Sequence, residues 1–177
     1  VVDLAADFRL DDPEAYPEWY GEAHTVPELL AESVYGLPEL FRADLEGATL
    51  VANPVCYPTS AALALAPLLR AGLIEATGIV VDAVSGVSGA GRTLKANTAF
   101  CAADGDVTAY GLLHHRHTPE IEQTLTAVGD TPAQVIFTPH LVPMSRGMLA
   151  TCYARPTGTT STEAVRAALA EAYADEA

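Results

Sequence analysis

The chain of 177 residues is long enough for one domain or slightly more, and half of its residues are hydrophobic. With 18% charged residues, this composition excludes general disorder. Nine lysines and arginines against 23 aspartates and glutamates give a net charge of −14, which repels nucleic-acid backbones and anionic lipids. We therefore expect no nucleic acid and no membrane among the partners, and prolines interrupt the one uncharged stretch long enough for a bilayer span, residues 47–69.

The three cysteines, Cys56, Cys101 and Cys152, are too few and too far apart to form a disulfide framework. This usage is typical of a reducing compartment, so we expect a cytoplasmic protein. The first residues have neither an initiator methionine nor the pattern of a signal peptide, and the last residues stop directly after a predicted helix. Both ends are therefore expected to be internal to a longer chain.

Glycines and prolines divide the chain into short elements that alternate between strand and helix periodicity, which predicts an α/β fold. Strands are predicted over residues 1–4, 49–52, 78–84, 134–138 and 149–153, and helices over residues 59–71, over 119–127 and after the capping-box pattern at 160–163. Pro67 is expected to kink or shorten the first helix. The long connector between the first two strands is irregular, and such connectors often carry function.

Cys56 lies in the segment Asn-Pro-Val-Cys-Tyr-Pro-Thr, between a predicted strand and the predicted helix that follows it. A thiol in the first turn of a helix is near unpaired backbone N–H groups and the positive end of the helix dipole, which favour the thiolate. Cys56 is therefore a candidate nucleophile, although a free cysteine is more commonly a buried structural residue. Cys101 and Cys152 are interpreted as structural residues.

Three of the five histidines, His114, His115 and His117, surround Arg116 just before the helix predicted over residues 119–127. Imidazoles could exchange protons during a thiol reaction, and the arginine could bind an anionic substrate. Zinc binding is the rival interpretation, but no cysteine or carboxylate motif of suitable spacing accompanies the histidines, so we expect no metal. A solvated loop without chemistry is a further alternative.

A glycine-rich segment, residues 85–92, follows the strand predicted over residues 78–84. Its small residues would let backbone N–H groups approach a phosphate or a flat cofactor ring, although its spacing matches neither the P-loop nor Gly-x-Gly-x-x-Gly. Arg146, in the segment Pro-Met-Ser-Arg-Gly, is a further candidate for binding an anion.

Seven segments resemble, in order, those of the N-acetyl-gamma-glutamyl-phosphate reductase family, which is related to aspartate-semialdehyde dehydrogenase. They are residues 3–9, 19–21, 34–40, 56–59, 85–92, 115–117 and 137–141. The resemblance implies the C-terminal end of a Rossmann-like nucleotide-binding domain over residues 1–75, followed over residues 76–177 by most of a mixed-sheet α+β substrate and dimerisation domain. It also implies a homo-oligomer, a dimer or a tetramer, and a chain that lacks the family's N-terminal nucleotide-binding segment and its C-terminal end.

The resemblance further implies a reaction of arginine biosynthesis. Cys56 would attack the acyl phosphate, phosphate would leave, and NADPH would reduce the thioester to N-acetylglutamate semialdehyde, with His115 or His117 exchanging a proton. The substrate's phosphate and carboxylate would be bound by Arg9, Arg116 and Arg146. The nicotinamide of NADP(H) would be approached by Ser85, Gly86, Ser88 and Gly89.

Val55 stands where this family usually has glycine, and a β-branched residue would be strained there if the turn needs a positive φ. Two alternative functions follow from the same residues. A cysteine and a histidine also serve acyl transfer to water, as in a thiol hydrolase or amidase, which would not need NADP(H). A non-catalytic binding or assembly fragment would result if Val55 distorted the loop.

Overall fold

The computed structural model describes residues 1–129 and 131–176. Strands β1 (Val2–Asp3), β3 (Leu50–Ala52) and β2 (Ser33–Tyr35) form a parallel sheet in the order β1-β3-β2. A second sheet has the order β5-β6-β4-β7 and consists of β5 (Thr108–Ala109), β6 (Val135–Leu141), β4 (Ile79–Ser85) and β7 (Met148–Tyr153). In this sheet β4 and β6 are parallel, whereas β5 and β7 are antiparallel to their neighbours. The predicted α/β fold with a mixed sheet is confirmed.

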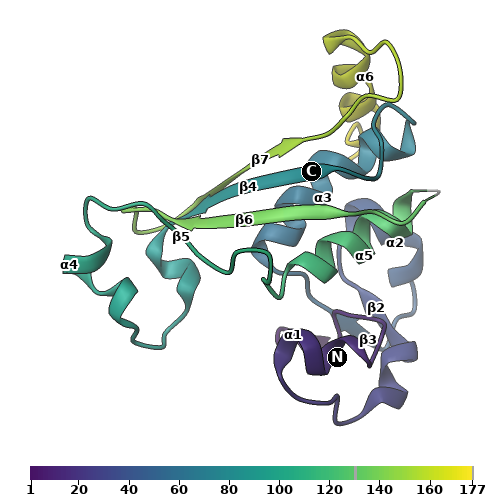
Figure 1. Cartoon of the computed structure of the whole chain (residues 1–177). Helices are drawn as coiled ribbons and strands as arrows, with labels where there is room; N and C mark the ends of the chain where they lie inside the picture. The colour runs from purple at the N-terminus through teal and green to yellow at the C-terminus, as the bar shows by residue number, and fades with distance from the viewer. Residues whose placement is uncertain (130, 177) are drawn as a thin grey trace.

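Helices cover one face of the mixed sheet (Figure 1). Helices α3 (Cys56–Arg70) and α5 (Thr118–Val128) pack against each other there, and α6 (Thr162–Ala172) packs against α3. Every second side chain of β4, including Ile79, Val81 and Ala83, is buried in the core beneath these helices. The intervening residues of β4 are half-buried, so one face of this strand is covered more fully than the other.

The connector between β1 and β3 contains short elements that its sequence did not predict. They are α1 (Ala15–Tyr20), the 3-10 helix η1 (Pro27–Glu32), β2 and α2 (Pro38–Leu45). Leu10, Tyr16 and Leu30 form a small separate core inside this region. The connector is therefore folded, and it carries α1 toward the loop that precedes α5 (Figure 1).

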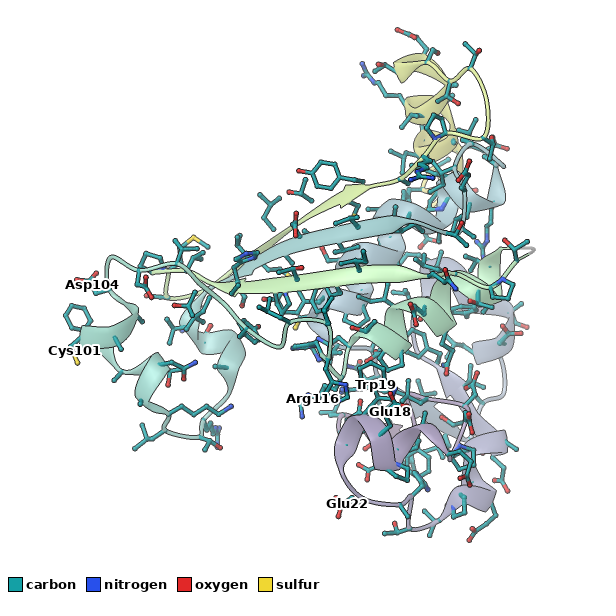
Figure 2. All side chains as sticks on the ribbon, viewed as in Figure 1. Glu18, Trp19, Glu22, Cys101, Asp104 and Arg116 are labelled. Atoms are coloured by element: carbon teal, nitrogen blue, oxygen red, sulfur yellow. The ribbon has the colours of Figure 1, made fainter. Side chains whose placement is uncertain are left out.

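Residues 86–112 form an arm that extends from the end of β4. It contains η2 (Val87–Ala90), η3 (Ala96–Thr98), α4 (Phe100–Ala103) and β5. Cys101 and Asp104 lie at the outer end of this arm, away from α3 and α5 (Figure 2). Cys101 is exposed, so its predicted role as a buried structural cysteine is wrong, whereas Cys152 is half-buried in β7.

Pro67 does not end α3, although proline lacks the N–H that would bond to the carbonyl of Leu63 one turn earlier. The hydroxyl of Tyr173, just beyond α6, donates a hydrogen bond to that carbonyl. The lost backbone bond is thus replaced by a tertiary contact. The expected shortening at Pro67 is therefore wrong, because α3 continues to Arg70.

Two helix starts differ from their predicted positions. Helix α3 begins at Cys56 rather than Thr59, and Pro58 fits its first turn, where backbone N–H groups have no partner within the helix. Helix α6 is capped by Ser161, whose hydroxyl accepts a hydrogen bond from the N–H of Ala164 at 3.2 Å. This cap lies one residue later than the capping box predicted.

No helix within residues 1–129 and 131–176 is both long and apolar enough to cross a bilayer.

Candidate active site

A cavity of about 400 Å³ lies where α1, the start of α3, the end of β4, the arm and the loop before α5 meet. It is lined by Trp19, Cys56, Tyr57, Ser85, Gly89, Ala90, Lys95, Asn97, Thr98, Tyr110, His114, His115, Arg116, His117 and Leu141. Another hollow, of about 300 Å³, lies on the arm against residues 143–145 and contains none of the predicted site residues. The larger cavity is therefore the candidate active site.

Cys56 is the first residue of α3, and its side chain is exposed to the cavity. This position places the sulfur at the positive end of a 15-residue helix, whose unpaired N–H groups favour negative charge. Val55 precedes it with φ −93° and ψ 169°, an extended conformation that any residue adopts. The expected strain at Val55 is therefore absent, and valine is compatible with this turn.

His115 and His117 lie next to each other on the cavity wall, with ring centroids 4.6 Å apart. The backbone N–H of His117 donates to Nδ1 of His115 at 3.1 Å. A neutral His115 ring therefore carries its proton on Nε2. His117 is only 7% exposed, and its Nδ1 has no hydrogen-bond partner among the described residues. Both rings pack near the aromatic ring of Tyr57, the residue that follows the candidate nucleophile.

Burial keeps both of these imidazoles neutral near pH 7. It lowers the pKa of His115 to about 4, with a smaller effect from the positive charge of Arg116. It lowers the pKa of His117 to about 3, with further contributions from His115, Arg116 and Arg9. The pair can therefore take part in hydrogen bonding and proton transfer without being positively charged in the resting site.

Lys95 and Arg116 are the permanently charged side chains among the described residues that line the cavity, and both are exposed. No aspartate or glutamate of residues 1–129 and 131–176 lines it, although the whole chain has a net charge of −14. Lys95 is also the one lysine in the sequence. The cavity is thus a local positive region in an acidic protein, which suits an anionic ligand.

Aromatic side chains form another part of the cavity wall. Trp19 of α1 stacks on His114, with ring centroids 4.7 Å apart and an interplanar angle of 15°. The hydroxyl groups of Tyr57 and Tyr110 lie 3.2 Å apart and share a hydrogen bond. Trp19 and Arg116 lie beside α1 and the loop that leads into α5 (Figure 2). The N-terminal connector therefore contributes directly to the site.

Six of the predicted site residues meet in this cavity: Cys56, His115, His117, Arg116, Ser85 and Gly89. Four others, Arg9, Arg146, Gly86 and Ser88, do not line it. The Arg9 guanidinium is buried and donates to the backbone carbonyls of Asn53 at 2.8 Å and Leu4 at 3.0 Å. Its donors therefore join the ends of β1 and β3 and do not face the cavity.

The glycine-rich segment contributes a wall of small residues, Ser85, Gly89 and Ala90. A Cβ on Gly89 would lie 2.5 Å from Oγ of Ser85, so a larger side chain there would require the Ser85 hydroxyl to move. Gly86 packs instead against backbone, because a Cβ on it would lie 2.8 Å from the amide nitrogen of Arg146. Residues 1–129 and 131–176 contain no group of three or more side chains suited to hold a metal ion.

Sequence reasoning missed several residues of the site, among them Lys95, Asn97 and Tyr110. Lys95 and Asn97 belong to the arm, which has little periodic pattern. The fact that Lys95 is the one lysine in the sequence was an available signal, although a single lysine does not by itself indicate a site.

Comparison with known proteins places the chain in a family. Residues 56–177 match the family described as "Semialdehyde dehydrogenase, dimerisation domain". The N-acetyl-gamma-glutamyl-phosphate reductase of Rhodospirillum rubrum is 54% identical over 177 residues, which cover 100% of this chain and 50% of that protein. The protein of the same name from Halorhodospira halophila is 59% identical over 153 residues, which cover 86% of this chain and 44% of that protein. The chain thus spans about half the length of the curated relatives it matches.

Solved structures agree with this family at the level of the fold. Aspartate semialdehyde dehydrogenase II from Vibrio cholerae has a TM-score of 0.62 at 18% identity, over 80% of this chain and 49% of that chain. With the match over residues 56–177, the chain belongs to the semialdehyde dehydrogenase family. The resemblance to N-acetyl-gamma-glutamyl-phosphate reductases inferred from the seven sequence segments is confirmed.

Acidification is expected to destabilise the protein through His115 and His117. Their pKa values in the folded state, about 4 and about 3, lie below the ordinary value of 6.5. As the pH falls from 6.5 toward 4, the unfolded chain binds protons that the folded chain does not, so the free energy of unfolding decreases. Urea unfolding from neutral to mildly acidic pH should show a smaller decrease for His117→Gln than for the wild type. An equal decrease would contradict the neutral state of His117.

Proposed function

We propose that this chain carries the nucleophile and the proton-transfer histidines of an NADP(H)-dependent N-acetyl-gamma-glutamyl-phosphate reductase, a cytoplasmic enzyme of arginine biosynthesis. The observation that carries this proposal is the meeting of Cys56, His115 and His117 in a cavity whose permanent charges are Lys95 and Arg116. The relatives that share about half of the chain's residues bear the name of this activity.

The proposed reaction begins at the sulfur of Cys56. Its thiolate attacks the carbonyl carbon of the acyl phosphate, the bond from this carbon to the phosphate oxygen breaks, and inorganic phosphate leaves a thioester on Cys56. Cys56 acts from the first turn of α3, where backbone N–H groups have no partner within the helix. Lys95 and Arg116 would hold the phosphate and the carboxylate of the substrate, because ammonium and guanidinium groups donate charge-assisted hydrogen bonds to such anions.

NADPH supplies a hydride to the thioester carbon when it is bound. An imidazole of the His115 and His117 pair would protonate the oxygen that becomes negative, and it would take the proton back as the aldehyde leaves and the thiolate re-forms. His115 carries a proton on Nε2 in its neutral form, as such a donor requires. His117 is the alternative donor, since its ring also lines the cavity.

The cofactor contacts follow the same loop. Ser85 and Gly89 line the cavity and would approach the nicotinamide, whereas Gly86 and Ser88 belong to the same turn but do not line the cavity. We place the domain boundary at residue 75, so that residues 1–75 complete a nucleotide-binding domain and residues 76–177 belong to the substrate and dimerisation domain. The described part of the second domain is organised around the mixed sheet, and that of the first contains the parallel sheet β1-β3-β2.

A homo-oligomer fits the exposed face of the mixed sheet. The matched family is described as a dimerisation domain. On the sheet face opposite the helices, Ile136, Leu149 and Tyr153 are each more than half exposed. Apolar side chains gathered on one sheet face are typical of surfaces that associate with another protein. This face supports a homo-oligomer, a dimer or a tetramer.

Replacing the nucleophile tests the proposed activity. In the full-length enzyme, Cys56→Ser should reduce the phosphate-dependent oxidation of N-acetylglutamate semialdehyde by NADP⁺ by about a thousandfold or more, because a hydroxyl is a far weaker nucleophile than a thiolate. Formation of NADPH measures the rate. Cys101→Ser is the matched control and should retain activity, since Cys101 lies at the outer end of the arm. Wild-type turnover of acyl substrates by water alone, without NADP(H), would instead support the thiol hydrolase.

Lys95 offers a test of how the substrate is bound. Lys95→Ala should raise the KM for the semialdehyde about tenfold, because a charge-assisted contact to an anionic group is lost. Steady-state kinetics over a range of semialdehyde concentrations measure this change. Arg92→Ala removes a positive charge from the same arm at an exposed residue that does not line the cavity, and it should leave the KM near the wild-type value. Equal effects of the two variants would show that only the overall charge of the arm matters.

A further inference from the structure

Glu120 is a buried carboxylate beneath the candidate active site. It is the third residue of α5, and its side chain is 0% exposed. Its Oε1 accepts a hydrogen bond from the Tyr35 hydroxyl at 2.7 Å and another from the backbone N–H of Val55 at 3.3 Å. Its Oε2 is buried and has no hydrogen-bond partner among the described residues. One carboxylate oxygen therefore joins β2, the turn before α3 and the first turn of α5.

The segments that meet at Glu120 each lead into the site. Val55 directly precedes Cys56 and is the N-cap residue of α3. Glu120 follows His117 by three residues, at the start of the helix that the histidine loop enters. Tyr35 comes from the connector that also supplies Trp19 to the cavity wall. The contacts of Glu120 thus connect the turn of the nucleophile to the loop of the histidines.

Burying a carboxylate at this position costs free energy that a neutral side chain would not. Burial disfavours the charged form and raises the pKa of Glu120. No cation of the described residues lies within ion-pair distance of it. The hydrogen bonds from Tyr35 and Val55 and the positive charges of Arg9 and Arg116 act against the effect of burial, but the pKa is still raised. Glu120 does not line the cavity, so it does not touch the substrate.

We propose that Tyr35 and Glu120 form a positioning pair for the nucleophile. Tyr35 orients the carboxylate, and the carboxylate holds the N–H of Val55, so that α3 begins at Cys56 and the sulfur stays in the cavity that His115 and His117 also line. A small displacement of a reacting group lowers the rate strongly even when binding is unchanged, so this contact acts on turnover. The inference rests on the proposed function in one respect, namely that Cys56 is the nucleophile.

The test compares Glu120→Ala, Glu120→Gln and Tyr35→Phe in the full-length enzyme. The first measurement is the alkylation rate of Cys56 by iodoacetamide, followed by mass spectrometry of its peptide, with exposed Cys101 in the same sample as reference. The second is kcat and KM. Glu122→Ala is the matched control, because Glu122 also holds a backbone N–H, that of Val135 at 2.8 Å, but lies outside the cavity.

We expect Glu120→Ala to slow both the alkylation of Cys56 and kcat by about tenfold while the KM changes by less than about twofold. Glu120→Gln keeps an acceptor oxygen and should recover most of both rates. Tyr35→Phe should lie between the two. The control Glu122→Ala should leave the alkylation rate of Cys56 unchanged. If a general loosening of α5 caused the effect, the control would slow the alkylation as well.

Wild-type alkylation rates in folded Glu120→Ala would overturn the inference, and so would equal losses in the alanine and glutamine variants. If Glu120→Ala does not fold, Tyr35→Phe decides the question, and a wild-type rate there overturns it. Alkylation is measured without substrate, so it separates the two proposals. Slower alkylation in a protein without reductase activity would support the positioning pair and contradict the proposed function.

Discussion

The turn between β3 and α3 determines the position of Cys56, the proposed nucleophile. β3 ends at Ala52 and α3 begins at Cys56, so only three residues separate the sheet from the helix. Extended backbone at Val55 brings the chain into the helix without strain, and the helix then packs along the mixed sheet. The core beneath α3 thus fixes the position of the first turn, which carries Cys56 and the backbone N–H groups that have no partner within the helix.

The other residues that line the cavity come from different segments of the chain. The histidine loop is tied to α5, which packs against α3 in the same core, so the imidazoles and the thiol share one support. Lys95 comes from the arm and Trp19 from the connector, and both lie outside that core. The thiol, the imidazoles and Arg116 are therefore joined to the helical core, whereas Lys95 and Trp19 belong to segments outside it.

Neutral histidines and exposed cations give the cavity an unequal distribution of charge. His117 is buried and His115 is half-buried, and both have lowered pKa values, whereas Lys95 and Arg116 are exposed. Positive charge is thus available at the accessible residues, where an anion would bind, and the neutral imidazoles do not add to it. This separation lets one cavity attract an anionic substrate and still contain proton donors that are uncharged near pH 7.

The sequence was sufficient where structure is determined locally. The β-branched run of β4 and the alanine-rich run of α3 predict a strand and a helix, and together with Pro58 they locate Cys56 at the junction. The sequence was insufficient to predict the role of a residue that depends on contacts with residues far away in the chain. Arg9 has the right charge to bind an anion, yet the fold uses it to hold carbonyl groups, and Glu120 becomes significant only because Tyr35 and Val55 fold against it. The lost helix bond at Pro67 is likewise replaced by a bond from Tyr173, just beyond α6.

The central claim is that Cys56 forms a covalent acyl intermediate, and mass spectrometry of the full-length enzyme tests it most directly. Incubation with N-acetylglutamate semialdehyde and NADP⁺ without phosphate should leave the N-acetylglutamyl group on the Cys56 peptide as a thioester, and added phosphate should remove it. An unmodified Cys56 under conditions in which NADPH is formed, or the same adduct on Cys101, would contradict the account.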